Sequence, residues 1–386
     1  MPRISDIIPD FTGCSIDNGS LRLVEKLGTG AFAVVYRALT SPLTPTEYAV
    51  KCVKKFKAGS RIAESQKLEA KLHQLVLGPR NIVHVHRVLE DRGYIYIVMD
   101  LWTSGDLMSS IADRCMYYQK DELLKQAFVQ LIDAVESCHD KGVYHRDLKP
   151  GNVLCSEDGS EVSLADFGLA TTQIYTEDFG LGSRSYTSPE SRDESVTRIP
   201  FSSAKFDIWA LGIVLVYMLT GRHPWRVAHP DDAEFMQYIR DPDFFRDRYP
   251  LSQETDAILR RVLAANPATR IELFELREEV LKVETFFMSD EDIVGASERV
   301  RRVADDCANK AGLLDSAGVS CYETAPSLIF SGPSASDAEC EAPPTPQIPM
   351  ACLPEVYAKL EAIKAEHADG FSLPSGNNMD DPVVAG

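Results

Sequence analysis

The sequence predicts an α+β fold of two lobes, a small one at about residues 21–100 and a larger one at about 101–285. Short runs of β-branched and aromatic residues, separated by turn residues, dominate the first region and predict strands with one helix. Apolar residues recur at helical spacing in the second region, which predicts a mostly helical lobe. The 386 residues, 44% of them apolar, are enough to bury a core in each lobe. Two such lobes favour a ligand cleft between them.

Five strands and one helix are expected in the small lobe. The strand candidates are rich in β-branched, aromatic and leucine residues and span 21–24, 34–36, 48–53, 83–88 and 94–99. The helix candidate spans 65–77, where Lys, Glu and Ala are frequent. Leu68, Leu72 and Leu75 fall on one face of it and form its apolar stripe.

Three helices are predicted in the larger lobe, at residues 123–139, 208–219 and 256–263. The second is apolar nearly all round, which is typical of a helix buried in a core. Its longest apolar stretch, 209–219, contains a glycine and is too short to span a bilayer. We therefore expect no membrane-spanning segment.

The net charge of −18 makes nucleic acid and anionic membrane surfaces poor partners, and we expect neither. Nine cysteines are scattered without CxxC pairs, and no secretory signal precedes them. This usage is typical of free thiols in a reducing compartment, so we expect a protein of the cytoplasm, the nucleus or both.

The chain outside the lobes is interpreted as a short lead-in at 1–20 and an acidic, largely disordered tail at 286–386. The tail carries 17 Asp or Glu residues against 6 Lys or Arg. A helix could begin near Ser289, where acidic residues would fill the first turn. A second helix is expected at 354–367, where it would either dock on the larger lobe or a partner protein, or remain marginal and solvated.

A glycine-rich turn joins the first two strands. Gly28, Thr29 and Gly30 lie in it, and glycines let backbone amides approach phosphate groups, although this pattern alone is weak evidence. Lys51 follows on the third strand, where a carboxylate that orients its ammonium group would favour phosphate binding. Glu69 and Glu64 compete for that role, and Glu69 is preferred because it borders the leucine stripe and has the better spacing.

The most informative residues form an ordered set of motifs in the larger lobe. In chain order these are HRDLKPGN at 145–152, ADFG at 165–168, SPE at 188–190, DIWALG at 207–212 and Arg270. On these residues the chain resembles the eukaryotic protein kinase superfamily over about residues 20–285. The resemblance implies the bilobal protein kinase fold and transfer of the γ-phosphoryl group of ATP, with Mg²⁺, to a protein hydroxyl.

The resemblance also implies the catalytic roles. Asp147 would accept the proton of the acceptor hydroxyl or align it, and Lys149 would lie beside the transferring phosphoryl group as a compact positive charge. Lys51, oriented by Glu69, would hold the α- and β-phosphates. Phosphoryl transfer needs in-line positioning and neutralised phosphate charge more than covalent work, so these residue types suit it.

The cofactor sites follow from the same resemblance. Asn152 and Asp166 would bind Mg²⁺, which prefers hard oxygen ligands. The residues expected around ATP are Leu27, Gly28, Thr29, Gly30, Val35, Ala49, Lys51, Met99, Asp100, Trp102, Asp106 and Leu154. Val35 and Ala49 would cover the adenine above Leu154, Asp100–Trp102 would offer hinge backbone groups, Met99 would guard the back pocket and Asp106 would bind the ribose.

Other motif residues are expected to support the site. Asp207 would cap backbone amides of the 145–152 loop, and Glu190 would pair with Arg270. Trp209 would be part of the core.

Lys149 and residues 182–186 resemble the serine/threonine class of kinases, in which Ser183 would contact Asp147 and Lys149. The substrate sequence stays open. Gly151 stands where kinases that prefer basic substrates often carry Glu, whereas Asp106 and the acidic surface leave attraction for basic peptides as a hypothesis.

The residue at the position of Arg146 usually pairs in this family with a phosphorylated residue of the activation segment, which would span 166–190 here. The position where many relatives carry that threonine is Phe179 here, and Asp178 and Glu177 precede it. We hypothesise that an acidic residue partly replaces the phosphate.

Residues 224–252 resemble one fungal kinase group that acts in nutrient signalling and meiotic control.

Two alternatives to an active protein kinase are a catalytically silent pseudokinase, serving as a scaffold through its acidic tail, and a small-molecule phosphotransferase. The presence of Lys51, Asp147 and Asp166 argues against the first, and the acceptor segment around Ser183 argues against the second.

Overall fold

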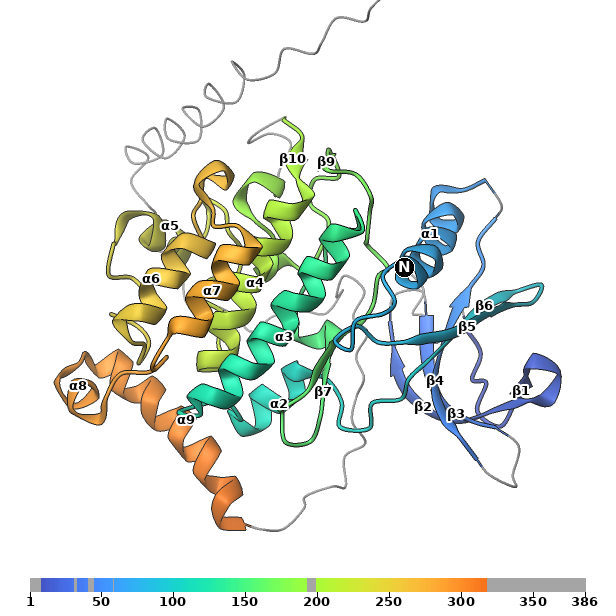
Figure 1. Cartoon of the computed structure of the whole chain (residues 1–386), viewed down its shortest axis with the longest axis horizontal. Helices are drawn as coiled ribbons and strands as arrows, with labels where there is room; N and C mark the ends of the chain where they lie inside the picture. Colours follow the sequence, from blue (N-terminus) through green and yellow to red (C-terminus); the bar gives the residue numbers. More distant parts are fainter. Residues whose placement is uncertain (1–7, 31–32, 41–44, 58, 193–198, 318–386) are drawn as a thin grey trace, which may run out of the picture.

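The computed structural model describes residues 8–30, 33–40, 45–57, 59–192 and 199–317. These residues form two lobes side by side, one built on a sheet and one mostly helical (Figure 1), which confirms the bilobal α+β fold expected from the sequence. The small lobe contains β1 (Ser15–Ile16), β2 (Leu21–Thr29), β3 (Ala33–Leu39), β4 (Glu47–Lys54), α1 (Arg61–Leu75), β5 (Val85–Glu90) and β6 (Tyr94–Met99).

The small lobe is an antiparallel sheet in the order β1-β2-β3-β4-β6-β5. Successive side chains of β4 alternate between its two faces, as strand geometry requires. Val50 and Cys52 pack into the cluster on the outer face, whereas Ala49 and Val53 pack into the cluster that includes Leu154 of the helical lobe. Lys51 lies between Ala49 and Val53, so the alternation directs its side chain to the face toward the helical lobe.

The predicted helix is present as α1, but its apolar stripe was assigned to the wrong face. Leu72 is buried, whereas Leu68 and Leu75 are 40% and 52% exposed. The buried face consists of Ala63, Gln66, Glu69, Ala70, His73 and, just beyond the helix, Val76. Contacts with Lys51 and with the helical lobe decide which face is covered, and leucine periodicity carries no information about such contacts.

The helical lobe begins after β6. It contains α2 (Leu107–Arg114), α3 (Asp121–Asp140), β7 (Val153–Cys155), β8 (Val162–Leu164), β9 (Tyr175–Thr176), β10 (Phe201–Ser202), α4 (Ser203–Thr220), α5 (Ala233–Arg240), α6 (Gln253–Val262), α7 (Leu273–Lys282), α8 (Asp290–Gly295) and α9 (Glu298–Ala317). The predicted helices are confirmed as α3, α4 and α6. The spacing of apolar residues did not reveal α2, α5 and α7, which have only eight to ten residues each.

Helix α4 is the centre of the helical lobe. Trp209 within it is fully buried, as expected. A Cβ atom on Gly212 would lie 2.8 Å from the side chains of Val262 and Leu263, so only glycine allows α4 and α6 to pack this closely. Among the described helices, α4 alone is long and apolar enough to cross a membrane, and 89% of it is buried inside the protein.

The chain after α7, where the sequence interpretation placed the start of the tail, continues as two further helices, α8 and α9. Ser289 caps α8 by accepting a hydrogen bond from the Asp292 amide at 3.1 Å, which confirms a helix start there. A second helix, α9, lies against the helical lobe and buries Val300 and Cys307. The helix predicted at 354–367 and the rest of the tail lie outside the described residues.

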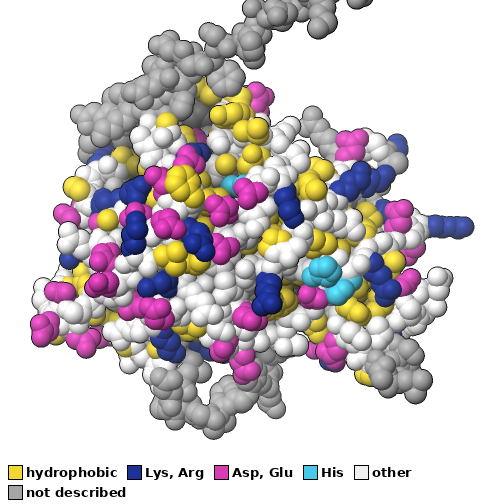
Figure 2. Space-filling view, viewed as in Figure 1, with side chains coloured by type: hydrophobic (Ala, Val, Ile, Leu, Met, Phe, Trp, Pro, Cys, Tyr) yellow, Lys and Arg dark blue, Asp and Glu magenta, His cyan; other side chains and the backbone are white. Residues whose placement is uncertain are grey.

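Charged side chains of both signs are interspersed over the visible face of the helical lobe (Figure 2). Pairs at the surface of this lobe include Arg277 with Asp133 at 2.7 Å and Lys205 with Glu272 at 2.5 Å. Exposed pairs of this kind contribute only about 0–1 kcal/mol each to stability.

Candidate active site

A buried ion network joins the two lobes at Lys51. The ammonium group contacts the carboxylate of Glu69 on α1 and lies 2.7 Å from Oδ1 of Asp166, which follows β8. Glu69 sits on the buried face of α1, whereas the competing candidate, Glu64, is exposed in the first turn. The structure therefore selects Glu69.

The charges of this network depend on one another. Burial opposes the ammonium form of Lys51, but Asp166 and Glu69 outweigh burial and raise the pKa of Lys51 above its ordinary value. Burial also disfavours the carboxylate of Asp166, yet Lys51 lowers the pKa of Asp166 below its ordinary value. For Glu69, burial dominates and raises the pKa. Lys51 is thus held as a cation next to ionised Asp166.

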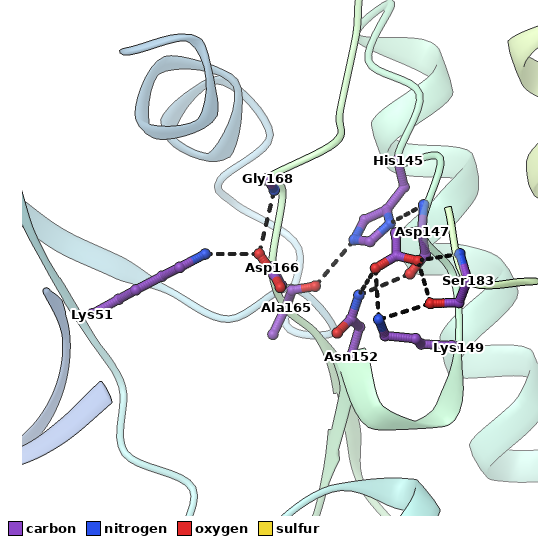
Figure 3. A network of polar contacts seen from close by, with 9 residues as sticks. All are labelled: Lys51, His145, Asp147, Lys149, Asn152, Ala165, Asp166, Gly168 and Ser183. Atoms are coloured by element: carbon purple, nitrogen blue, oxygen red, sulfur yellow. Dashed lines mark hydrogen bonds and ion pairs between the residues drawn. The ribbon is translucent and has the colours of Figure 1, made fainter. Parts of the chain in front are cut away.

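The second part of the site surrounds Asp147 (Figure 3). Oδ1 of Asp147 accepts hydrogen bonds from the amide and the hydroxyl of Ser183, at 3.1 and 2.9 Å. Oδ2 accepts from Nζ of Lys149 at 2.8 Å and from Nδ2 of Asn152 at 3.0 Å. Lys149 also donates to Oγ of Ser183 at 2.9 Å, so the contacts expected between these residues are present.

Asp207 on α4 fixes the backbone that presents Asp147. Its carboxylate is fully buried and accepts hydrogen bonds from the amides of His145 and Arg146, both at 2.8 Å. Arg146 has a φ of +62°, a strained value for a residue with a side chain. The two hydrogen bonds stabilise that conformation, and they confirm the capping role expected for Asp207.

The side-chain oxygen of Asn152 identifies where a cation would bind. Asn152 is fully buried and its amide nitrogen donates to Asp147, but its Oδ1 has no hydrogen-bond partner among the described residues. A buried, unpartnered oxygen is costly unless a ligand satisfies it. Together with the ionised Asp166, this oxygen fits the hard donor set that Mg²⁺ prefers. No group of three or more His, Cys, Asp or Glu able to hold a metal occurs elsewhere in the described part of the chain.

The residues expected around adenine come together in one apolar cluster. Val35, Ala49, Met99 and Leu154 are buried in it, and Leu27, Leu101 and Trp102 pack against it half-buried. The backbone of Asp106 is bridged to Leu154. Thus residues from both lobes pack into the same apolar cluster.

Asp106 and the glycine-rich turn have further structural roles. Oδ1 of Asp106 caps α2 by accepting from the amide of Ser109 at 2.8 Å, and burial raises the pKa of this carboxyl. Gly28 and Thr29 end β2, and Gly30 donates its amide to the carbonyl of Ala33 at 2.8 Å, closing the turn. Residues 31 and 32 at its tip lie outside the described residues.

The activation segment is tied to the catalytic loop by an acidic side chain. Oδ2 of Asp178 lies 2.6 Å from Nη1 of Arg146, whose Nε also donates to the carbonyl of Leu169 at 2.8 Å. At the end of the segment, Glu190 forms two hydrogen bonds with Arg270, at 2.7 and 3.0 Å, which confirms the expected pair.

His73 is a positioning residue that the sequence interpretation missed. Its ring packs against Phe167, with 4.5 Å between ring centroids, and its Nε2 contacts the carbonyl of Val83 at 2.8 Å. His73 lies one helical turn after Glu69. This i, i+4 spacing places both residues on one face of the helix, and it was the signal in the sequence that could have revealed His73.

Comparison with known proteins agrees with this geometry. Residues 21–281 match the protein kinase domain. The chain belongs to the protein kinase family. It is 40% identical over 276 residues to the negative regulator of sexual conjugation and meiosis of Schizosaccharomyces pombe, covering 67% of this chain and 58% of that protein.

Two further fungal relatives are serine/threonine-protein kinases. Ksp1 of Schizosaccharomyces pombe is 36% identical over 70% of this chain and 58% of its own length. VHS1 of Saccharomyces cerevisiae is 30% identical, with 72% of each chain covered. The chain thus spans less than two thirds of the length of the first two relatives. These matches support membership of a fungal serine/threonine kinase group, and the family as a whole uses ATP and Mg²⁺.

Proposed function

We propose that this protein catalyses transfer of the γ-phosphoryl group of ATP to serine or threonine hydroxyls of other proteins. The observation that carries the proposal is the simultaneous presence of the Lys51–Glu69–Asp166 network and of Asp147 beside Ser183. Phosphoryl transfer requires both parts, because the first holds the phosphates and the second aligns the acceptor.

Each residue has a physical task in this reaction. Lys51 would bind the α- and β-phosphates with a charge that Asp166 and Glu69 keep on it. Asp147 would accept the hydroxyl proton, and Lys149 would lie at the γ-phosphoryl group. Mg²⁺, when held by Asn152 and Asp166, would supply neutralisation of the phosphate charge.

The test compares the purified chain with Asp166→Asn in transfer of labelled γ-phosphate to a degenerate serine/threonine peptide library. We expect transfer by the first and none by the second. A folded wild-type chain that binds ATP and transfers nothing would instead identify a scaffold or an enzyme that needs an activator.

We further propose that the activation segment is ordered without phosphorylation. Asp178 pairs with Arg146 where the family commonly uses a phosphate, and a carboxylate supplies part of the same charge. Activity that survives exhaustive phosphatase treatment would support this, and complete loss would refute it.

The cellular role is proposed from the fungal relatives, one of which is named for conjugation and meiosis. We propose intracellular signalling in the cytoplasm, the nucleus or both, with protein substrates and with partners that bind the acidic tail. The tail should be tested by truncation after residue 317. A cut near 286 would also remove α9, which buries Val300 and Cys307 against the helical lobe, and would confound partner binding with instability.

A further inference from the structure

The residues that follow Ser183 are placed to read the substrate. Ser183 contacts Asp147 through both its amide and its hydroxyl, so its backbone lies at the point where the acceptor hydroxyl must arrive. Arg184 is the next residue, one Cα–Cα step of about 3.8 Å away. A substrate residue directly beside the acceptor is one such step from the acceptor. Because Arg184 directly follows Ser183 and is exposed, its side chain begins one residue away from the group that contacts Asp147.

Hydrogen bonds hold the acceptor platform, residues 182–186. The amide of Tyr186 donates to the carbonyl of Ser183 at 2.8 Å, and the hydroxyl of Thr187 donates to the carbonyl of Arg184 at 2.8 Å. Tyr186 is buried and its hydroxyl contacts Nε2 of His223 at 2.8 Å. Because these contacts hold the turn, Arg184 is presented from a fixed backbone.

A second arginine lies beside the platform. The hydroxyl of Ser185 donates to the carbonyl of Arg226 at 3.1 Å, which places the backbone of Arg226 next to the Ser185 side chain. The side chain of Arg226 is 89% exposed, and its Nε is 3.9 Å from Asp232. That carboxylate already accepts from the amides of Arg226 and Val227, so it neutralises the guanidinium only weakly.

Two exposed guanidinium groups, those of Arg184 and Arg226, therefore lie on or beside the acceptor platform in a chain whose net charge is −18. Arg184 is exposed and forms no ion pair with any residue that the structure describes. Burial holds the pKa of His223 at about 4, so this ring is neutral and the positive charge comes from the arginines. The carboxylate of Asp106, which the sequence offered as an attraction for basic peptides, is buried as the cap of α2.

We propose that Arg184 and Arg226 make the platform select protein segments with a carboxylate directly beside the acceptor serine or threonine. This rests on the proposed kinase activity and names its substrate class. Arginine suits the task because its planar guanidinium matches a carboxylate in a bidentate arrangement.

The experiment measures kcat/KM on five peptides that share one acceptor serine: an Ala reference, and peptides with Asp or Lys at one flanking position. Separate peptides place the charge before and after the serine. For the wild-type chain we expect Asp on one flank to exceed Ala by about fivefold, the size expected for an exposed ion pair, and the ratio to shrink as salt is raised. Arg184→Glu should invert the ratio so that the Lys peptide becomes the better substrate.

The matched control is Arg92→Glu, which makes the same charge change at an exposed turn of the small lobe and should keep the wild-type ratio. If Arg184→Glu does not fold, Arg184→Gln and Arg226→Gln take its place, and both should bring the Asp and Ala peptides closer together. Equal rates on the Asp and Ala peptides, or an unchanged ratio in the Arg184 variants, would overturn the proposal while leaving the kinase activity intact. A wild-type chain that phosphorylates none of the peptides would overturn both.

Discussion

Removing Asp178 tests the most specific feature of this kinase domain, an activation segment held by a carboxylate. Arg146 has only 10% of its side chain exposed and is 2.6 Å from Asp178, which is 50% exposed. A charge-assisted hydrogen bond contributes about 1.5–3 kcal/mol, and the exposure of Asp178 reduces this to about 1–2 kcal/mol. Loss of this free energy would change the ratio of ordered to disordered segment by roughly 5- to 30-fold.

The assay is the initial rate of peptide phosphorylation by phosphatase-treated Asp178→Ala and Asp178→Asn. We expect a fall of about fivefold or more in Asp178→Ala and a smaller fall in Asp178→Asn, which keeps a hydrogen bond but not the charge. Glu177→Ala is the control, since it removes an exposed carboxylate from the adjacent position and should leave the rate within about twofold. Thermal unfolding verifies that the variants stay folded. Full activity in Asp178→Ala would refute the reasoning.

Three further results are expected. Asp147→Asn should lower kcat by about 10²–10⁴-fold without loss of folding, because Asn preserves the shape of the site but cannot accept the proton; unchanged kcat would exclude Asp147 as the base. Arg270→Met should lower the free energy of unfolding in denaturant titrations by about 3–5 kcal/mol, since the buried Glu190 would lose both hydrogen bonds from Arg270. Adding Glu190→Gln should restore part of the loss, and strictly additive losses would contradict the coupling. Burial holds the pKa of His73 at about 4 against 6.5 in the unfolded chain, so stability is lost as the pH falls below 6.5 toward 4. The free energy of unfolding falls by about 2 kcal/mol between pH 7 and 5 for this reason, and His73→Gln should remove that part of the pH dependence. An identical pH profile in the variant would show that His73 does not titrate in this way.

The chemistry was predictable from the sequence because it depends on residue types in a fixed order. The motifs around Asp147 and Asp166 identified the site, and the change from strand-like to helical periodicity identified the two lobes. These signals are local, since each is contained within a few residues or one helical repeat.

Other features depend on contacts between distant segments and emerge only from the folded chain. The structure confirmed the preference for Glu69 over Glu64, and it buried the face of α1 that carries His73 while leaving Leu75 exposed. It also placed α9 against the helical lobe, where Val300 is fully buried. Lys51 and Asp166 are 115 positions apart, and periodicity within a segment cannot report which distant surface will cover it. The groups that make up the site were therefore evident from residue types and motif order, and the packing of the lobes determined which of these groups meet.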